Sequence, residues 1–138
     1  ADKKPKYLTE VQPGFVYGLD GQTYNKAFAI VCEGQLDALH IEGCALGGSE
    51  ISDQQAMLLN RLQKQIIVVP DRDSAGKKLV ERAIELGWSV SLPEWNQEIN
   101  DIGEAVSKYG RLYTLYSIAN TAEDSPLKIR LRAKKWFG

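Results

Sequence analysis

The sequence has very little of the chemistry that builds zinc sites or disulfide frameworks. Among its 138 residues there are two cysteines, Cys32 and Cys44, and a single histidine, His40. This set is too small for a typical four-ligand zinc site. Both cysteines fall in segments with a strand-like pattern, so we expect two buried, reduced thiols rather than a disulfide or a catalytic cysteine.

The sequence also lacks an excess of charge of either sign. Its 17 Lys and Arg against 18 Asp and Glu give a formal net charge of -1 at pH 7. No global field therefore draws the chain to nucleic acid, and any such binding must come from a local basic patch or from other parts of the protein. A long apolar run and a secretory signal are missing as well, so we expect a cytoplasmic protein with no membrane partner. We interpret the first residue, Ala1 in place of a methionine, as the mark of an excised fragment.

Two apolar runs, each followed at once by acidic residues, carry most of the information in the chain. Residues 27–32 (AFAIVC) lead into EGQLD at 33–37, and residues 66–70 (IIVVP) lead into DRDSAG at 71–76. Continuous runs rich in Val and Ile are typical of strands covered on both faces, as in a parallel sheet between helices. The carboxyl ends of such strands meet at one edge of the sheet, where the functional crevice lies.

The acids Glu33, Asp71 and Asp73 are therefore expected together at that edge. Crowded carboxylates repel one another, and a divalent cation relieves that cost. Hard oxygen ligands suit Mg²⁺, with Mn²⁺ as a second choice. The alternatives are that Glu33 is a surface acid at a strand end and that Asp73 only caps the following helix.

The remaining pattern predicts strands and helices in alternation, which indicates an α/β fold built from βαβ units. The expected strands are 27–32, 43–46, 66–69 and 88–92. The expected helices are 35–41, one opening at Ser52 with a capping box, 74–86, 101–108, 112–119 and 126–135. A hairpin is expected around Asp20-Gly21. Leu36 and Leu39, with Ala38 as a further candidate, are expected to face the core.

The order and spacing of the acidic segments resemble the TOPRIM domain, a fold shared by bacterial-type primases, topoisomerases and some nucleases. That family has Glu-Gly-x-x-Asp after its first strand and Asp-x-Asp after its third, matched here by 33–37 and 71–73. The resemblance implies a four-stranded, mainly parallel, Rossmann-like sheet flanked by helices. It divides the chain into an N-terminal lead-in (1–25), a TOPRIM domain (26–108) and a C-terminal helical extension (109–138).

Asp-x-Asp-x-Ala-Gly followed by a helix with Lys and Arg, and a later Asn100-Asp101, resemble DNA primases of the bacterial and phage type. This resemblance implies a nucleotidyltransferase that makes short RNA primers from ribonucleoside triphosphates on a single-stranded DNA template. It implies Mg²⁺ as the cofactor, a role in replication, a phage or plasmid origin, and a replicative helicase as a candidate partner. We expect the fragment alone to bind metal but to prime poorly.

The resemblance also assigns roles to residues. Glu33, Asp71 and Asp73 would be catalytic and would bind the metal, with Asp101 as a further ligand. The residues that would support the metal or contact nucleotide are Gly34, Asp37, Arg72, Gly76 and Lys77. Asp101 could equally be a helix cap, Asp37 could simply stabilise a helix dipole, and Lys78 and Arg82 fit a solvated helix face.

The sequence also fits two other functions. One is a metal-dependent nuclease or topoisomerase-like strand cleaver, and the other is a non-catalytic module of a replication complex. The basic segment 128–135, which ends in Trp136-Phe137, is typical of a solvated amphipathic helix. The alternative is that this segment follows a nucleic-acid backbone.

Overall fold

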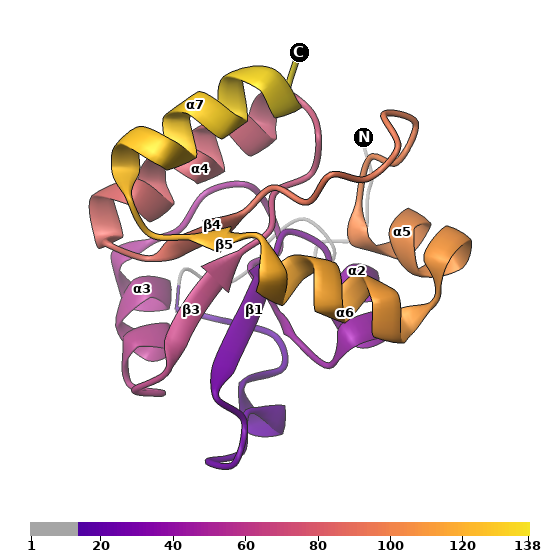
Figure 1. Cartoon of the computed structure of the whole chain (residues 1–138). Helices are drawn as coiled ribbons and strands as arrows, with labels where there is room; N and C mark the ends of the chain where they lie inside the picture. The colour runs from indigo at the N-terminus through magenta and orange to yellow at the C-terminus, as the bar shows by residue number, and fades with distance from the viewer. Residues whose placement is uncertain (1–13) are drawn as a thin grey trace, which may run out of the picture.

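One five-stranded sheet forms the centre of the computed structural model, which describes residues 14–138. Its strand order is β2-β1-β3-β4-β5 (Figure 1). The strands are β1 (Phe28–Cys32), β2 (Cys44–Ala45), β3 (Gln65–Val68), β4 (Ser89–Ser91) and β5 (Ala122–Glu123). All neighbouring pairs are parallel except β4 and β5, which are antiparallel. The expected α/β fold with a mainly parallel sheet is confirmed.

Helices cover both faces of this sheet, as the continuous apolar runs of β1 and β3 predict (Figure 1). The helices are α2 (Gln35–Ile41), α3 (Asp53–Asn60), α4 (Ser74–Leu86), α5 (Ile102–Tyr109), α6 (Arg111–Asn120) and α7 (Pro126–Trp136). On one face, Ala29 and Val31 pack with residues of α3, α4 and α7. On the other face, Ile30 and Cys32 pack with residues of α2, α5 and α6. Neither face of the two central strands is left to solvent.

Helix boundaries follow local signals in the sequence. Ser52 caps α3, and its hydroxyl and the side chain of Gln55 form the predicted capping box. Helix α4 begins and ends as predicted, because Gly87 takes the left-handed conformation (φ 76°) that stops it. Cys32 and Cys44 are buried free thiols, as expected. Within residues 14–138, no helix is both long enough and apolar enough to cross a membrane.

The predicted core face of α2 is wrong for Leu36 and Leu39 but right for the further candidate, Ala38. Leu36 and Leu39 are 74% and 60% exposed, whereas Ala38 and Ile41 are buried. Residues three apart share a helix face. This short helix therefore has two apolar faces, one with Leu36 and Leu39 and one with Ala38 and Ile41, and only one of them can face the sheet. The stripe of Ala38 and Ile41 faces the sheet, which leaves the two leucines outside the core.

The predicted hairpin at Asp20-Gly21 is also wrong. These residues belong to a 3₁₀ turn, η1 (Leu19–Gly21), and Tyr17 pairs with Ala45 through two backbone hydrogen bonds of 2.9 and 3.0 Å. Gly18, directly before η1, takes a left-handed conformation (φ 85°). A Cβ at Gly18 would lie 2.4 Å from the carbonyl oxygen of Gly43, so only glycine fits this turn.

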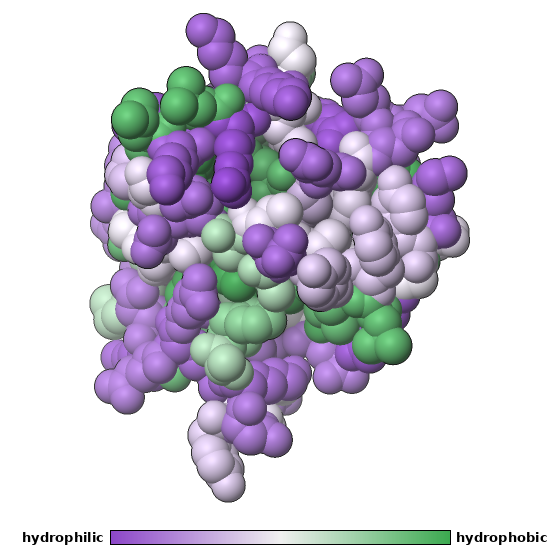
Figure 2. Space-filling model, in the orientation of Figure 1, coloured by the Kyte–Doolittle hydropathy of each residue, from purple (hydrophilic) through white to green (hydrophobic). Residues whose placement is uncertain are grey.

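The C-terminal segment adds the antiparallel strand β5, which the sequence did not predict. Its two residues pair with Val90 and Ser91 of β4. The chain then enters α7, which packs beside α4 (Figure 1). The face of the molecule in Figure 2 is mainly hydrophilic, with hydrophobic patches over α7 and α6. Exposed leucines of these helices include Leu112, Leu127 and Leu131.

Candidate metal and phosphate site

The two acidic motifs meet at the carboxyl edge of the sheet. Glu33 directly follows β1, and Asp71 follows β3, which is paired with β1 in parallel so that Val31 lies beside Val68. The backbone N–H of Asp71 donates a hydrogen bond of 3.0 Å to Oε2 of Glu33. The Glu33 side chain is thereby fixed against the loop that carries the second motif.

Two further acids of the predicted site begin helices. Asp73 caps α4, where its Oδ1 accepts a hydrogen bond of 2.8 Å from the N–H of Gly76. Asp101 caps α5 in the same way, with 2.8 Å from its Oδ1 to the N–H of Glu104. Each cap uses one carboxylate oxygen. The capping role that the sequence offered as an alternative is therefore real for both residues, and it leaves a second oxygen on each.

Asp37 joins two helices beside the same edge. Its Oδ1 accepts a hydrogen bond of 2.8 Å from the N–H of Gly103, in the first turn of α5. A Cβ at residue 103 would lie 2.9 Å from that oxygen, so a glycine lets the carboxylate approach the helix end. The sequence did not indicate this partner, because 66 residues separate the two positions.

The electrostatics of the cluster show that its negative charge is poorly compensated. Burial, and after it the neighbouring carboxylates with Glu33 first, raise the pKa of Asp71 from 3.8 to about 7. Burial also raises the pKa of Glu33, against the lowering effect of its hydrogen bond from Asp71. The pKa of Asp37 is raised by burial and by Asp101, against the effect of its bond from Gly103. In the described part of the chain, none of these acids forms an ion pair with a Lys or Arg.

These donors fit a Mg²⁺ ion that keeps part of its water shell. All are carboxylate oxygens, the ligand type that Mg²⁺ prefers. Between residues 14 and 138, no three acidic, His or Cys side chains lie close enough to form a closed metal cage. Mg²⁺ needs none, because it is usually held by one or two carboxylates together with waters and substrate phosphates. A cation here would also offset the crowding that raises the pKa of Asp71.

The two predicted glycines differ in how strictly they are required. A Cβ at Gly76 would lie 2.0 Å from the backbone oxygen of Asp71, so the first turn of α4 can contact the acidic loop only with glycine there. Gly34 has an ordinary φ of -103°. A Cβ at Gly34 would lie 3.7 Å from Oδ2 of Asp37, which is normal contact. The backbone at Gly34 therefore does not require glycine, and the missing side chain leaves open space beside the carboxylates.

The predicted cations are distributed unequally around the cluster. The guanidinium of Arg72 lies 4.4 Å from the ring centroid of Trp136. Lys77 is exposed, with its ammonium 5.9 Å from the ring centroid of Phe137. Arg82 is committed elsewhere, since it pairs with Asp53 at 2.9 Å. Burial lowers the pKa of Arg72. The aromatic end of α7 thus lies over the loop of the second motif, a contact that no local pattern in the sequence could reveal.

Comparison with known proteins agrees with this geometry. The sequence model of the Toprim-like family matches residues 30–105, more than half of the chain. The chain therefore belongs to the Toprim-like family. A DNA primase of Aquifex aeolicus (strain VF5) is 30% identical to it over 128 residues, which cover 80% of this chain and 26% of the primase.

Two solved structures of primases have a fold similar to that of this chain. A crystal structure of the zinc-binding and RNA polymerase domains of the Aquifex aeolicus primase superposes with a TM-score of 0.69 at 25% identity. It covers 99% of this chain and 41% of that one. A structure of a DnaG catalytic core has the same fold, with a TM-score of 0.63 at 23% identity over 81% of this chain and 41% of that one. The chain is a TOPRIM domain of the DnaG-like type, and it spans about a quarter of the curated primase.

Proposed function

We propose that this chain is the catalytic TOPRIM part of a DNA primase, which joins ribonucleotides into short RNA primers on single-stranded DNA. The observation that carries the proposal is the hydrogen bond between Asp71 and Glu33, because it brings both acidic motifs to one edge of the sheet. The similarity to primases in sequence and fold supports the same function.

Glu33, Asp71, Asp73 and Asp101 are the candidate ligands of Mg²⁺, or of Mn²⁺ in its place, and one or two of them would bind the ion together with water and phosphate. A bound divalent cation supplies charge stabilisation to the triphosphate and to the pyrophosphate that leaves. Glu33 keeps its second oxygen free of hydrogen bonds among the described residues and is suited to accept a proton there. The pKa of Glu33 is raised, so its carboxylate is a better proton acceptor at neutral pH than the carboxylate of an exposed glutamate.

The contacts of three other predicted residues favour supporting roles for them. Asp37 holds the start of α5, and with it Asp101, against α2. Gly76 allows α4 to begin directly behind the loop of Asp71 and Asp73. Lys77, exposed one residue further along, is placed to neutralise phosphate charge.

The partners follow from the reaction. They are a single-stranded DNA template and ribonucleoside triphosphates, with a replicative helicase as a further candidate. We place the reaction in the cytoplasm of a bacterium or of a phage-infected host, where replication occurs. The division into a lead-in (1–25), a catalytic unit (26–108) and a C-terminal extension (109–138) stays a prediction.

Extension of an RNA primer that is already annealed to a DNA template tests the proposal. Supplying the annealed primer removes the need for template selection and initiation. We expect the chain to add labelled ribonucleotides opposite the template when Mg²⁺ is present. Because the double variant Asp71→Asn, Asp73→Asn loses metal stabilisation of the reaction, we expect it to be slower by about 100-fold or more.

The same reaction mixture distinguishes the other functions. Cleavage of either labelled strand without extension would contradict the primase proposal and favour a metal-dependent nuclease. An intact template and an unextended primer, with a protein that binds Mn²⁺, would contradict catalysis and favour a non-catalytic module. The matched control is Asp20→Asn, which removes an exposed aspartate of the η1 turn and should extend the primer like the wild type.

A further inference from the structure

A pocket of about 650 Å³ lies behind the acidic loop, between the end of α7 and the loop that follows β4. Its volume is in the range of small-molecule sites. Three cations line it, Arg72, Arg132 and Lys135, against one acid, Glu94. None of the acids proposed to hold metal is among the lining residues. The pocket is therefore a separate basic compartment that shares only Arg72 with the acidic loop.

Arg72 points out of its own acidic motif and into this pocket. Its guanidinium lies over Trp136, and one N–H donates a hydrogen bond of 3.3 Å to the backbone oxygen of Asn96. Its Nε is buried and has no hydrogen-bond partner among the described residues. No carboxylate in the described part of the chain pairs with it. A guanidinium has five N–H donors, so most of its capacity is unused.

The aromatic ring on which Arg72 stacks is anchored by two contacts. The indole N–H of Trp136 donates a hydrogen bond of 2.7 Å to the backbone oxygen of Pro93. Phe137 packs edge-on against the same indole, with 5.0 Å between ring centroids. Because the indole is held from both sides, the guanidinium that stacks on it is held as well. A positioned arginine with free donors is suited to bind an anion with two oxygens at once.

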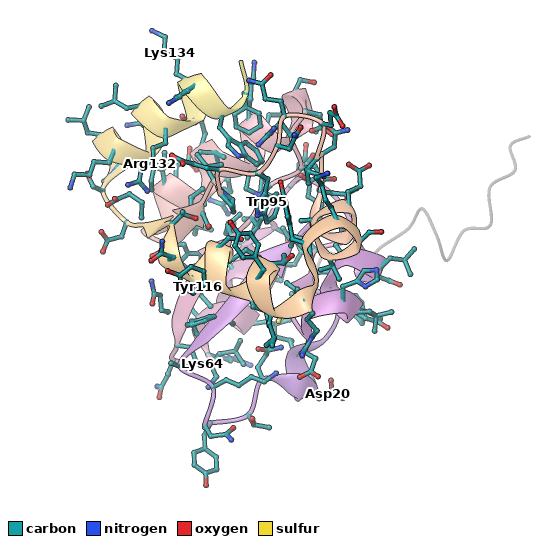
Figure 3. All side chains as sticks on the ribbon, turned by 45° about the vertical axis from the view of Figure 1, so that its right-hand side comes forward. Asp20, Lys64, Trp95, Tyr116, Arg132 and Lys134 are labelled. Carbon is teal, nitrogen blue, oxygen red and sulfur yellow. The ribbon has the colours of Figure 1, made fainter. Side chains whose placement is uncertain are left out.

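The other two cations differ in how free they are. Arg132 forms an ion pair with Glu123 at 3.7 Å and donates a hydrogen bond of 3.2 Å to the backbone oxygen of Thr121. Lys135 has no hydrogen bond or ion pair with any side chain of the described residues. Figure 3 shows Arg132 on α7 and Trp95 on the same side of the molecule, whereas Lys134 points away into solvent. Arg72 and Lys135 are thus the two cations available to a ligand.

We propose that this pocket binds the phosphate group of a nucleotide, with Arg72 and Lys135 as its main contacts and Trp136 as the surface that positions Arg72. The choice of a nucleotide as ligand rests on the proposed function. The phosphate could belong to a free ribonucleoside triphosphate or to a single strand of nucleic acid, since the two share this chemistry. The position of the pocket behind the acidic loop would hold such a nucleotide beside the proposed metal site.

Binding in metal-free buffer tests this inference separately from catalysis. The probes are a fluorescent single-stranded oligothymidylate, titrated with the chain in the presence of EDTA, and ATP as a competitor. We expect Arg72→Ala and Lys135→Ala each to weaken binding about fivefold to tenfold. Each should also reduce the slope of log K against log salt by about 0.7, the value for one phosphate contact on a single strand. Lys134→Ala is the matched control on the same helix and should change affinity less than about twofold.

Each result has a defined meaning. Displacement by ATP at a concentration similar to that of the strand supports a site for free nucleotide, and displacement only by unlabelled strand supports a site for nucleic acid. Equal affinities for Lys135→Ala, Arg72→Ala and Lys134→Ala would overturn the inference. So would equal binding of polyglutamate with the same dependence on Arg72. The variant Asp71→Asn, Asp73→Asn should bind the probe at least as well as the wild type, so failure of catalysis and failure of this pocket are distinguishable.

Discussion

The backbone N–H of Asp71 and Oε2 of Glu33 are 3.0 Å apart, and this hydrogen bond joins residues separated by 38 positions in the sequence. It connects the carboxyl ends of the two central strands. The same edge gathers Asp37, Asp73 and Asp101, whose charges all raise the pKa of Asp71. The fold therefore holds a group of acids together at an electrostatic cost.

That cost predicts how stability depends on pH. The pKa of Asp71 is raised from 3.8 to about 7 in the folded protein, so between these pH values the folded state binds more protons than the unfolded state. Without metal, its contribution to the free energy of unfolding is then lost as pH rises from about 4 to about 7. Asp71→Asn lacks this loss. We expect it to be more stable than the wild type at pH 8 by on the order of 1 kcal/mol, reduced by solvent screening, with little difference at pH 4.

Urea denaturation in EDTA at both pH values measures this difference. Asp20→Asn removes an exposed aspartate from the η1 turn and serves as the control with no such pH dependence. If Asp71→Asn and the wild type lost stability in parallel between pH 4 and pH 8, the assignment of a raised pKa to Asp71 would be wrong.

Substitutions at Asp73 separate its cap from its charge. Asparagine keeps an oxygen that can accept the bond from Gly76, whereas alanine removes it. We expect Asp73→Asn to leave metal-free stability nearly unchanged and Asp73→Ala to cost about 1 kcal/mol. Both should weaken binding of Mn²⁺, because both remove the carboxylate. Thermal denaturation with and without Mn²⁺ checks this pattern, and full metal binding by Asp73→Asn would reduce Asp73 to a helix cap.

Gly76→Ala tests the close contact behind the acidic loop. The added Cβ would lie 2.0 Å from the backbone oxygen of Asp71, and neither backbone can yield freely. We expect a loss of about 3 kcal/mol in the free energy of unfolding. Gly48→Ala is the matched control, because a Cβ there meets no atom within 4 Å. A Gly76→Ala protein as stable as Gly48→Ala would show that the loop and α4 are not in this contact.

The sequence predicts the parts of the molecule that depend on local pattern. The runs before Glu33 and Asp71 are apolar throughout because helices cover both faces of β1 and β3, and this pattern alone places the acids at one edge. Asp73 and Asp101 were open to a capping role because aspartate at a helix start is a local signal.

Contacts between distant segments carry no such signal. Gly103 beside Asp37 and Trp136 beside Arg72 depend on how helices pack, and neither follows from spacing. Strand β5 has two residues, too few to show the alternation of apolar and polar residues that predicts a strand. Leu36 and Ala38 are both apolar, so the sequence of the helix alone does not determine which of the two is buried. Packing of the helix against the sheet determines it.

The most direct measurement of the central claim is titration of the chain with Mn²⁺ by isothermal calorimetry, comparing the wild type with Glu33→Gln. Glutamine keeps an oxygen that can accept the hydrogen bond from Asp71 but removes the charge. If acids from both strands share one cation, Glu33→Gln weakens Mn²⁺ binding by at least about tenfold, while Asp20→Asn binds like the wild type. Unchanged Mn²⁺ affinity in Glu33→Gln would contradict the account.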